Sequence, residues 1–144
     1  MVVKAMETEV LYVKDLNANY QNIVKGAEYL KKGEVVAIPT ETVYGLAADA
    51  FNENAVKKIF KAKGRPQDNP LIIHIAEIEE MKSLVTNISS TAFKFIQNFW
   101  PGPMTVILPK SSVVPDITSA SLDNVGIRMP SNIIARELIK AARV

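Results

Sequence analysis

Apolar residues recur along the chain with two different spacings, which predicts that short strands and helices alternate. Short apolar runs predict strands at residues 10–13, 34–39, 71–75, 104–108 and 125–129, with a further extended segment at 46–51. Apolar residues at every third or fourth position predict helices at residues 19–32, 53–63, 78–85, 90–100 and 132–142. Residues 109–124 show neither spacing and are predicted to be a long polar connection. Alternating strands and helices are typical of an α/β fold.

Residues that cap or stop helices support these bounds. Gly33 follows the first predicted helix at the C′ position, where glycine is preferred. Asn52 is placed to cap the second helix, and Gly64 is placed to end it. The side of the helix at residues 90–100 that we expect to be buried carries Phe93, Ile96, Phe99 and Trp100.

The composition fits a single globular domain over residues 1–144. Apolar residues make up 48% of the chain and charged residues 22%, which is enough apolar surface to bury a core. The absence of cysteine excludes disulfides and cysteine metal sites and fits a reducing compartment. Residues 1–16 lack the apolar centre of a signal peptide, and no apolar run reaches the ~18 residues of a membrane span. We therefore expect a cytoplasmic protein without a membrane partner.

Positive charge is concentrated at one predicted helix end. The net charge is only +2 and the pI is about 8.8, which permits nucleic-acid binding without requiring it. Lys61, Lys63 and Arg65 nevertheless cluster where the second helix ends. Cations at a helix C-terminus are often only solvated, but a lysine charge and an arginine fork around Gly64 also suit a phosphate chain. Both interpretations stay open, and the sequence contains no P-loop and no Gly-x-Gly-x-x-Gly motif.

Residues 40–45 form a polar run directly after the predicted strand at 34–39. Thr40 and Thr42 offer hydroxyl groups, and Tyr44 offers a ring and a hydroxyl. Ligands of α/β folds bind outside the carboxyl ends of the strands, which makes this run a candidate binding loop. A simple turn explains the same residues equally well.

Two polar side chains interrupt apolar strands. His74, the only histidine, lies in Leu-Ile-Ile-His-Ile, where a satisfied core histidine is the more common case. Arg128 lies in Val-Gly-Ile-Arg-Met-Pro, where burial requires either an internal carboxylate or an anionic ligand. The guanidinium fork would suit the carboxylate of a substrate.

Four blocks of sequence, taken together, resemble the motifs of YrdC-like domains. The first is Ile-Pro-Thr-Glu-Thr-Val-Tyr-Gly-Leu at residues 38–46. The second runs from Ile-Phe-Lys-Ala-Lys-Gly-Arg-Pro at 59–66 to Asn-Pro-Leu-Ile-Ile-His at 69–74. The others are Trp-Pro-Gly-Pro-Met-Thr at 100–105 and Val-Gly-Ile-Arg-Met-Pro at 125–130. The blocks occur in the family's order, so the resemblance covers the chain from about residue 19 to its end.

The resemblance implies a twisted mixed sheet, flanked by helices, around a concave basic cavity. Well-known members of this family are threonylcarbamoyl-adenylate synthases. The resemblance therefore implies formation of threonylcarbamoyl-AMP and pyrophosphate from L-threonine, bicarbonate and ATP, assisted by Mg²⁺. The product would serve the threonylcarbamoyl modification of tRNA adenosine through downstream transferase proteins, so tRNA is an indirect partner.

The matched motifs also assign roles to residues. Lys63 and Arg65 would bind the ATP phosphates and neutralise charge during the reaction. Thr40, His74 and Arg128 would hold threonine and its carbamate. Tyr44 and Thr105 would line the cavity, and no metal-ligating residue is implied.

One departure from the family pattern concerns the end of the chain. Family members continue beyond the last helix into a strand and a Ser-x-Asn segment that contacts the nucleotide, and we expect this domain to lack both.

Two alternatives to a synthase stay open. One is an RNA-binding YrdC-like module that uses Lys57, Lys58 and Lys61 with the basic motif. The other is a YrdC domain of the carbamoyltransferase type.

Overall fold

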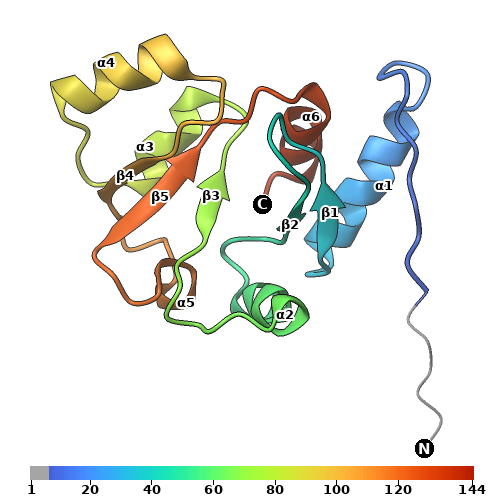
Figure 1. Cartoon of the computed structure of the whole chain (residues 1–144), viewed down its shortest axis with the longest axis horizontal. Helices are drawn as coiled ribbons and strands as arrows, with labels where there is room; N and C mark the ends of the chain where they lie inside the picture. The colour runs from blue at the N-terminus through green and yellow to red at the C-terminus, as the bar shows by residue number, and fades with distance from the viewer. Residues whose placement is uncertain (1–6) are drawn as a thin grey trace, which may run out of the picture.

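Helices surround two small sheets in the computed structural model, which describes residues 7–144 (Figure 1). The helices are α1 (Tyr20–Lys31), α2 (Glu53–Lys63), α3 (Met81–Leu84), α4 (Ser90–Phe99), α5 (Asp116–Ser119) and α6 (Ile133–Ala142). The 3-10 turn η1 (Ile78–Glu80) leads into α3, so the helix predicted at residues 78–85 is two short pieces. None of the helices in the described part of the chain has the length and apolar content needed to cross a membrane.

The strands are divided between the two sheets. β1 (Val36–Ile38) and β2 (Gly45–Ala47) pair as an antiparallel hairpin. In the second sheet, β5 (Asn124–Arg128) is parallel to β3 (Ile72–His74) and antiparallel to β4 (Val106–Pro109). The α/β class and the mixed sheet predicted from the sequence are therefore confirmed, although the hairpin does not extend the mixed sheet.

Local sequence sets the bounds of α1 and α2 as predicted. The Asn52 side chain accepts hydrogen bonds from the backbone N–H groups of Asn54 (3.1 Å) and Ala55 (3.2 Å), which caps α2. Gly64 ends α2 in the left-handed conformation, with φ of 59°. Gly33 ends α1 in the same way, with φ of 74°, because glycine enters this region without a steric cost.

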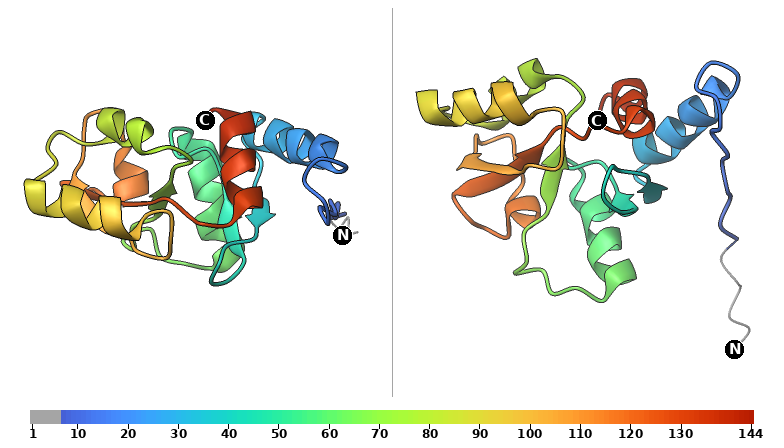
Figure 2. Two further views of the ribbon diagram at one scale, coloured as in Figure 1. Left: turned by 90° about the horizontal axis from the view of Figure 1, so that it is seen from above. Right: turned by 45° about the horizontal axis from the view of Figure 1, so that its top comes forward.

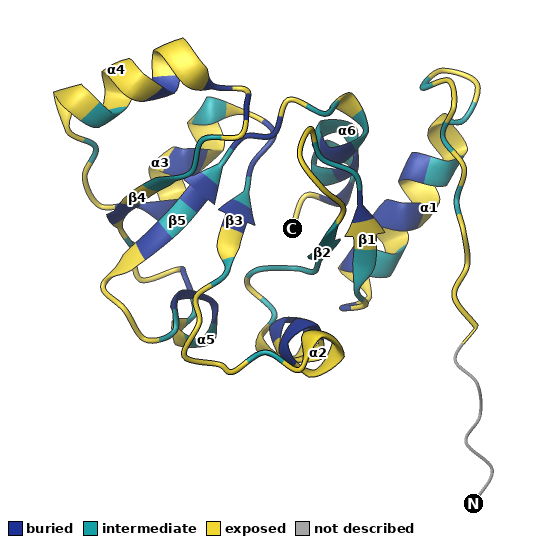
Figure 3. Cartoon of the chain, viewed as in Figure 1, coloured by how far each residue is buried: buried dark blue, intermediate teal, exposed yellow. Residues whose placement is uncertain are grey.

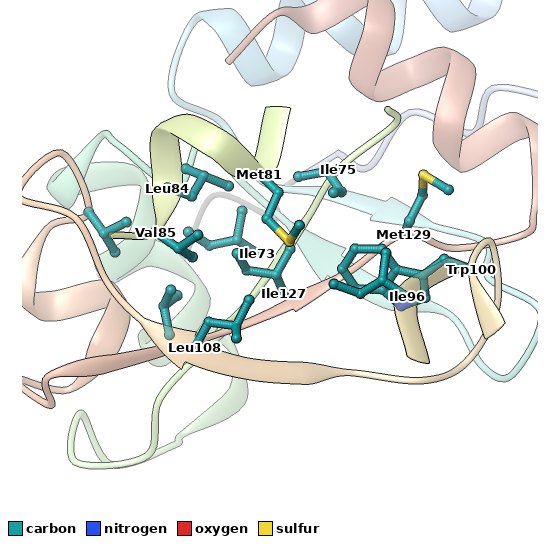
Figure 4. Packing of buried hydrophobic residues seen from close by; sticks show 12 residues of the cluster. Ile73, Ile75, Met81, Leu84, Val85, Ile96, Trp100, Leu108, Ile127 and Met129 are labelled. Carbon is teal, nitrogen blue, oxygen red and sulfur yellow. The ribbon is translucent and has the colours of Figure 1, made fainter. Parts of the chain in front are cut away.

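Each sheet has a hydrophobic core of its own. The larger core fills the space between the mixed sheet and the helices η1, α3 and α4 (Figure 4). Its members include Ile73, Met81, Leu84, Ile96, Trp100, Leu108, Val125 and Ile127. The smaller core joins β1 to α1 and α6, which lie side by side in all views (Figure 2). Gly26 permits this approach, since a Cβ atom there would lie 3.1 Å from Leu138 Cδ1.

The prediction of a strand at residues 10–13 is wrong. This segment is extended but pairs with no strand, and Val10 and Tyr12 are exposed. It is held instead by α1, where the Asn22 side chain donates a hydrogen bond to the Tyr12 carbonyl (2.8 Å) and Lys25 pairs with Glu9. An apolar run forms a strand only where a neighbouring strand accepts its backbone hydrogen bonds.

The connection predicted at residues 109–124 contains the short helix α5, which the sequence spacing missed. α5 buries polar side chains, so it has no apolar periodicity to detect. The Thr118 hydroxyl donates to the Ala50 carbonyl (2.8 Å), and Lys110 donates to Asp116 (2.6 Å) and Ser119 (2.8 Å). Polar contacts therefore order this segment.

The buried side of α4 is narrower than predicted. Ile96 and Trp100 are buried, as expected, but Phe93 and Phe99 are 42% and 55% exposed. Most of α4 is drawn as exposed in Figure 3. The helix lies at the margin of the larger core, where a single row of side chains reaches the sheet.

Replacing Ile127 by alanine should lower the free energy of unfolding by about 2–5 kcal/mol, because it leaves a cavity in the larger core. Ile127 is 0% exposed at the centre of the mixed sheet. The matched control is Ile107→Ala on β4, where the side chain is 72% exposed and the change should cost less than ~0.5 kcal/mol. Urea unfolding measures both, and equal losses would contradict the assigned core.

Candidate ligand-binding cavity

A cavity of about 540 Å³ is lined by residues of both cores. Its walls come from α1, β1, β2, α2, β3, β5 and α6 and from the loop between β1 and β2. Five of the seven residues to which the family motifs assign roles line it: Thr40, Lys63, Arg65, His74 and Arg128. Segments far apart in the sequence thus bring cations, hydroxyl groups and an imidazole to one space.

Thr40 organises the loop between β1 and β2. Its hydroxyl donates to the Val43 carbonyl (2.6 Å) and accepts from the backbone N–H groups of Thr42 and Val43, both at 3.2 Å. Because the Thr40 proton goes to Val43, the Thr42 hydroxyl, 3.0 Å away, donates to Thr40. The turn and the binding-loop interpretations are therefore compatible: Thr40 holds the turn and also lines the cavity.

Tyr44 and Thr105 are not among the residues that line this cavity. The Tyr44 side chain is 76% exposed in the loop that follows Thr42. Thr105 precedes β4, and its Cγ2 atom would lie 3.2 Å from a Cβ atom at Gly126, so it packs over the middle of β5. Contact of Tyr44 and Thr105 with a ligand therefore stays a prediction, and neither residue lines the cavity.

Gly64 turns the chain so that the residues on both of its sides reach the cavity. Lys63 is the last residue of α2, and Arg65 follows the left-handed glycine. Arg65 Nη2 donates to the Pro70 carbonyl (3.3 Å), while its Nε is buried without a hydrogen-bond partner among the described residues. Lys61 belongs to the same basic cluster but does not line the cavity. The cluster is therefore divided between the cavity and the outer surface of α2.

His74 and Arg128 lie opposite one another on the parallel strands β3 and β5. His74 Nδ1 is 3.3 Å from the Ile72 carbonyl oxygen, which can only accept, so Nδ1 carries the proton. His74 Nε2 is then an acceptor, and it is buried without a partner among residues 7–144. Burial and the charge of Arg128 lower the pKa of His74 below its ordinary value of 6.5, so the imidazole is neutral at neutral pH.

Arg128 has an internal carboxylate as its partner, one of the two possibilities predicted from the sequence. Its Nη2 lies 2.8 Å from Glu41 Oε1 and 3.4 Å from Thr42 Oγ1, and its Nε donates to the Gly102 carbonyl (3.3 Å). Burial raises the pKa of Glu41, but the hydrogen bond from Arg128, backbone hydrogen bonds at Glu41 and Ser131 and the charge of Arg128 together outweigh it, so that pKa lies below its usual value. Glu41 was not singled out from the sequence, although a carboxylate next to Thr40 and Thr42 was visible there.

The pKa of His74 should be below 6.5 in the folded protein, and NMR titration of its ring protons measures it without ambiguity because the chain has one histidine. Arg128→Gln should raise this pKa, since it removes the positive charge that opposes protonation. Stability should fall as the pH drops through 6.5 toward the folded-state pKa, because the unfolded chain then binds the additional proton. A folded-state pKa of 6.5 or higher would contradict the described environment of His74.

Comparisons with known proteins match the chain to one family. A family model described as telomere recombination, for Sua5, YciO and YrdC proteins, matches residues 28–144. The threonylcarbamoyl-AMP synthase of Pyrococcus abyssi is 54% identical over 114 residues, which are 79% of this chain and 34% of the relative. The threonylcarbamoyl-AMP synthase of Bacillus subtilis is 47% identical over 127 residues, 88% of this chain and 37% of the relative. The chain thus spans about a third of the length of these relatives.

The fold is also that of a solved structure. The crystal structure of P. abyssi Sua5 complexed with L-threonine aligns with a TM-score of 0.84 at 51% sequence identity. The alignment covers 85% of this chain and 36% of that chain.

Proposed function

Because the chain belongs to the Sua5, YciO and YrdC family, we propose that it forms threonylcarbamoyl-AMP and pyrophosphate from L-threonine, bicarbonate and ATP. The observation that carries this proposal is one cavity lined by two cationic side chains, Lys63 and Arg65, and by the pair His74 and Arg128. A relative at 51% identity was solved with L-threonine, which supports the amino acid as substrate.

His74 and Arg128 make up the amino-acid end of the proposed site. The guanidinium of Arg128 is held by Glu41 and the Gly102 carbonyl, and its Nη1 donors have no partner among the described residues. They are suited to the carboxylate of threonine. His74 Nε2 accepts a hydrogen bond from the threonine hydroxyl or amine, which would satisfy a nitrogen that is otherwise buried without a partner.

Lys63 and Arg65 make up the nucleotide end. Neither side chain forms an ion pair within residues 7–144, so both charges are available to phosphate oxygens. Mg²⁺ belongs to the proposal as part of the substrate MgATP, held by the phosphate oxygens. Both side chains line the cavity, so they would supply the positive charge of the concave basic cavity that the family resemblance implies.

The proposed chemistry needs positioning and charge neutralisation more than a protein base. Threonine and bicarbonate give a carbamate with loss of water. A carbamate oxygen attacks the α-phosphorus of ATP, the bond from that phosphorus to the bridging oxygen of the β-phosphate breaks, and pyrophosphate leaves with the bond electrons. The carbamate is already an anion, so no proton has to be removed from it. Lys63 and Arg65 would stabilise the charge that develops on the phosphate oxygens.

The product would be consumed by transfer of its threonylcarbamoyl group to adenosine of tRNA, a step carried out by other proteins. This places tRNA downstream of the cavity. An RNA-binding module without synthase activity would bind RNA through the exposed lysines of α2 and release no pyrophosphate.

Pyrophosphate release from ATP, with L-threonine and bicarbonate omitted in turn, tests the proposed function. The expected result is release that requires both compounds. Release that is independent of threonine would instead indicate hydrolysis of ATP, and release that requires added carbamoyl phosphate in place of threonine and bicarbonate would favour the carbamoyltransferase type. RNA binding that weakens steeply with salt, without pyrophosphate release, would overturn the synthase proposal in favour of the RNA-binding alternative.

Lys63→Ala should weaken ATP binding about tenfold and leave threonine binding unchanged, because a hydrogen bond to a charged group contributes about 1.5–3 kcal/mol. The matched control is Lys61→Ala, which removes the same charge from the same helix but outside the cavity. Calorimetric titration with a non-hydrolysable analogue of ATP measures the nucleotide affinity of both variants. Equal effects of the two substitutions would show that only the overall charge of the helix end matters.

A further inference from the structure

The guanidinium of Arg128 is fixed by partners on two of its three nitrogens. Nε donates to the Gly102 carbonyl, and Nη2 contacts both Glu41 and Thr42. The side chains of Arg128 and Glu41 are 12% and 19% exposed, so both are partly shielded from water although the backbone of the loop is exposed. Arg128 and Thr42 line the cavity but Glu41 does not, so the carboxylate holds Arg128 from outside the ligand space.

Glu41 also changes the charge that Arg128 presents. A carboxylate at 2.8 Å cancels most of the field of the guanidinium while leaving the directed N–H donors of Nη1 in place. Lys63 and Arg65 differ from Arg128 in this respect, because neither pairs with a carboxylate in the described part of the chain. The cavity therefore contains cations without a carboxylate partner among the described residues, which are Lys63, Arg65 and Arg143. It also contains Arg128, which offers hydrogen-bond donors at nearly zero net charge, and Lys140, which pairs with Glu77 and Glu137.

We propose that Glu41 is a specificity-determining residue that keeps phosphate groups away from Arg128 and reserves this side chain for the carboxylate of a zwitterionic amino acid. The inference rests on the proposed function. It adds how one cavity binds the phosphates of the nucleotide and the carboxylate of the amino acid at different side chains. Glu41 acts through Arg128 and does not touch the substrate.

The physical basis is the different charge of the two ligands. A nucleotide triphosphate carries several negative charges and gains most where cations are uncompensated, at Lys63 and Arg65. At Arg128 the same phosphate would also meet the negative charge of Glu41, and like charges brought together oppose binding. A free amino acid has no net charge, so hydrogen-bond geometry decides its binding, and Glu41 fixes that geometry by orienting the fork.

Competition between inorganic phosphate and L-threonine tests this role. The Kd of L-threonine is measured by calorimetry with and without inorganic phosphate, at constant ionic strength, for the wild type and for Glu41→Gln. Phosphate should leave the wild-type Kd unchanged and should raise the Kd of Glu41→Gln at least about fivefold, because the uncompensated Arg128 then attracts phosphate. Competition in the wild type, or none in Glu41→Gln, would overturn the proposal.

Two controls separate the charge of Glu41 from general effects. Glu34→Gln removes the same charge from the ion pair with Lys58, away from the cavity, and should behave like the wild type. Glu41→Asp keeps the charge and should restore resistance to phosphate, which a merely structural role of the side chain would not predict. If Glu41→Gln is poorly folded, Glu41→Met replaces it as a variant of similar length without charge.

A direct phosphate titration followed by ³¹P NMR, without threonine, keeps this inference separate from the proposed function. Glu41→Gln should gain a phosphate site that the wild type lacks, and a second substitution, Arg128→Gln, should remove it. Failure to gain this site overturns the role of Glu41 even if threonine binds. Failure of the wild type to bind threonine overturns the proposed substrate, while the phosphate titration still decides what Glu41 does.

Discussion

The alternation of side chains along β5 ties the larger core to the cavity. Successive residues of a strand point to opposite faces of the sheet. Val125 and Ile127 are 1% and 0% exposed on the face that packs against α3 and α4, and Arg128 must therefore lie on the other face. The parallel register with β3 then places His74 beside it. A shift by one residue would bury the guanidinium in the core and expose the isoleucine, so the packing of the core fixes the position of the site.

Glu41 and Arg128 connect the two sheets beside the cavity. Among the ion pairs of residues 7–144, theirs is the one that joins the β1–β2 loop to the mixed sheet. Such a partly buried pair is weak evidence for stability, because removing charges from water offsets much of their attraction. Its effect on geometry is clearer, since it holds the guanidinium and the loop with Thr40 and Thr42 in one arrangement.

The cavity thus separates two kinds of cation that look alike in the sequence. Lys63 and Arg65 flank a left-handed glycine at a helix end and retain their charge, as a phosphate chain requires. Arg128 lies inside a sheet, where burial demanded a carboxylate and Glu41 provides one. In the proposed synthase this difference assigns the nucleotide to Lys63 and Arg65 and the amino acid to Arg128 within one cavity. Burial and the charge of Arg128 lower the pKa of the His74 imidazole, which in the proposed synthase would join Arg128 in holding the amino acid.

The sequence by itself determined the helices whose capping residues, helix-ending glycines and apolar spacing lie within a few residues of one another. The cap at Asn52, the left-handed glycines at residues 33 and 64, and the helices that they delimit follow from such signals. The candidate residues Thr40, Lys63, Arg65, His74 and Arg128 could also be named, because unusual polar groups in fixed motifs stand out in a sequence.

Tertiary structure decided everything that depends on a distant partner. Residues 10–13 have strand composition but no strand beside them, and Phe99 has helical spacing but lies beyond the edge of the core. The pairing of Glu41 with Arg128 joins residues 87 positions apart, a distance that no local pattern encodes. The charge state of a side chain, its burial and the group with which it pairs depend on the residues that the fold places around it. The sequence could therefore name the chemical groups of the site, and only the folded chain determined which of them are neutralised and which face the cavity.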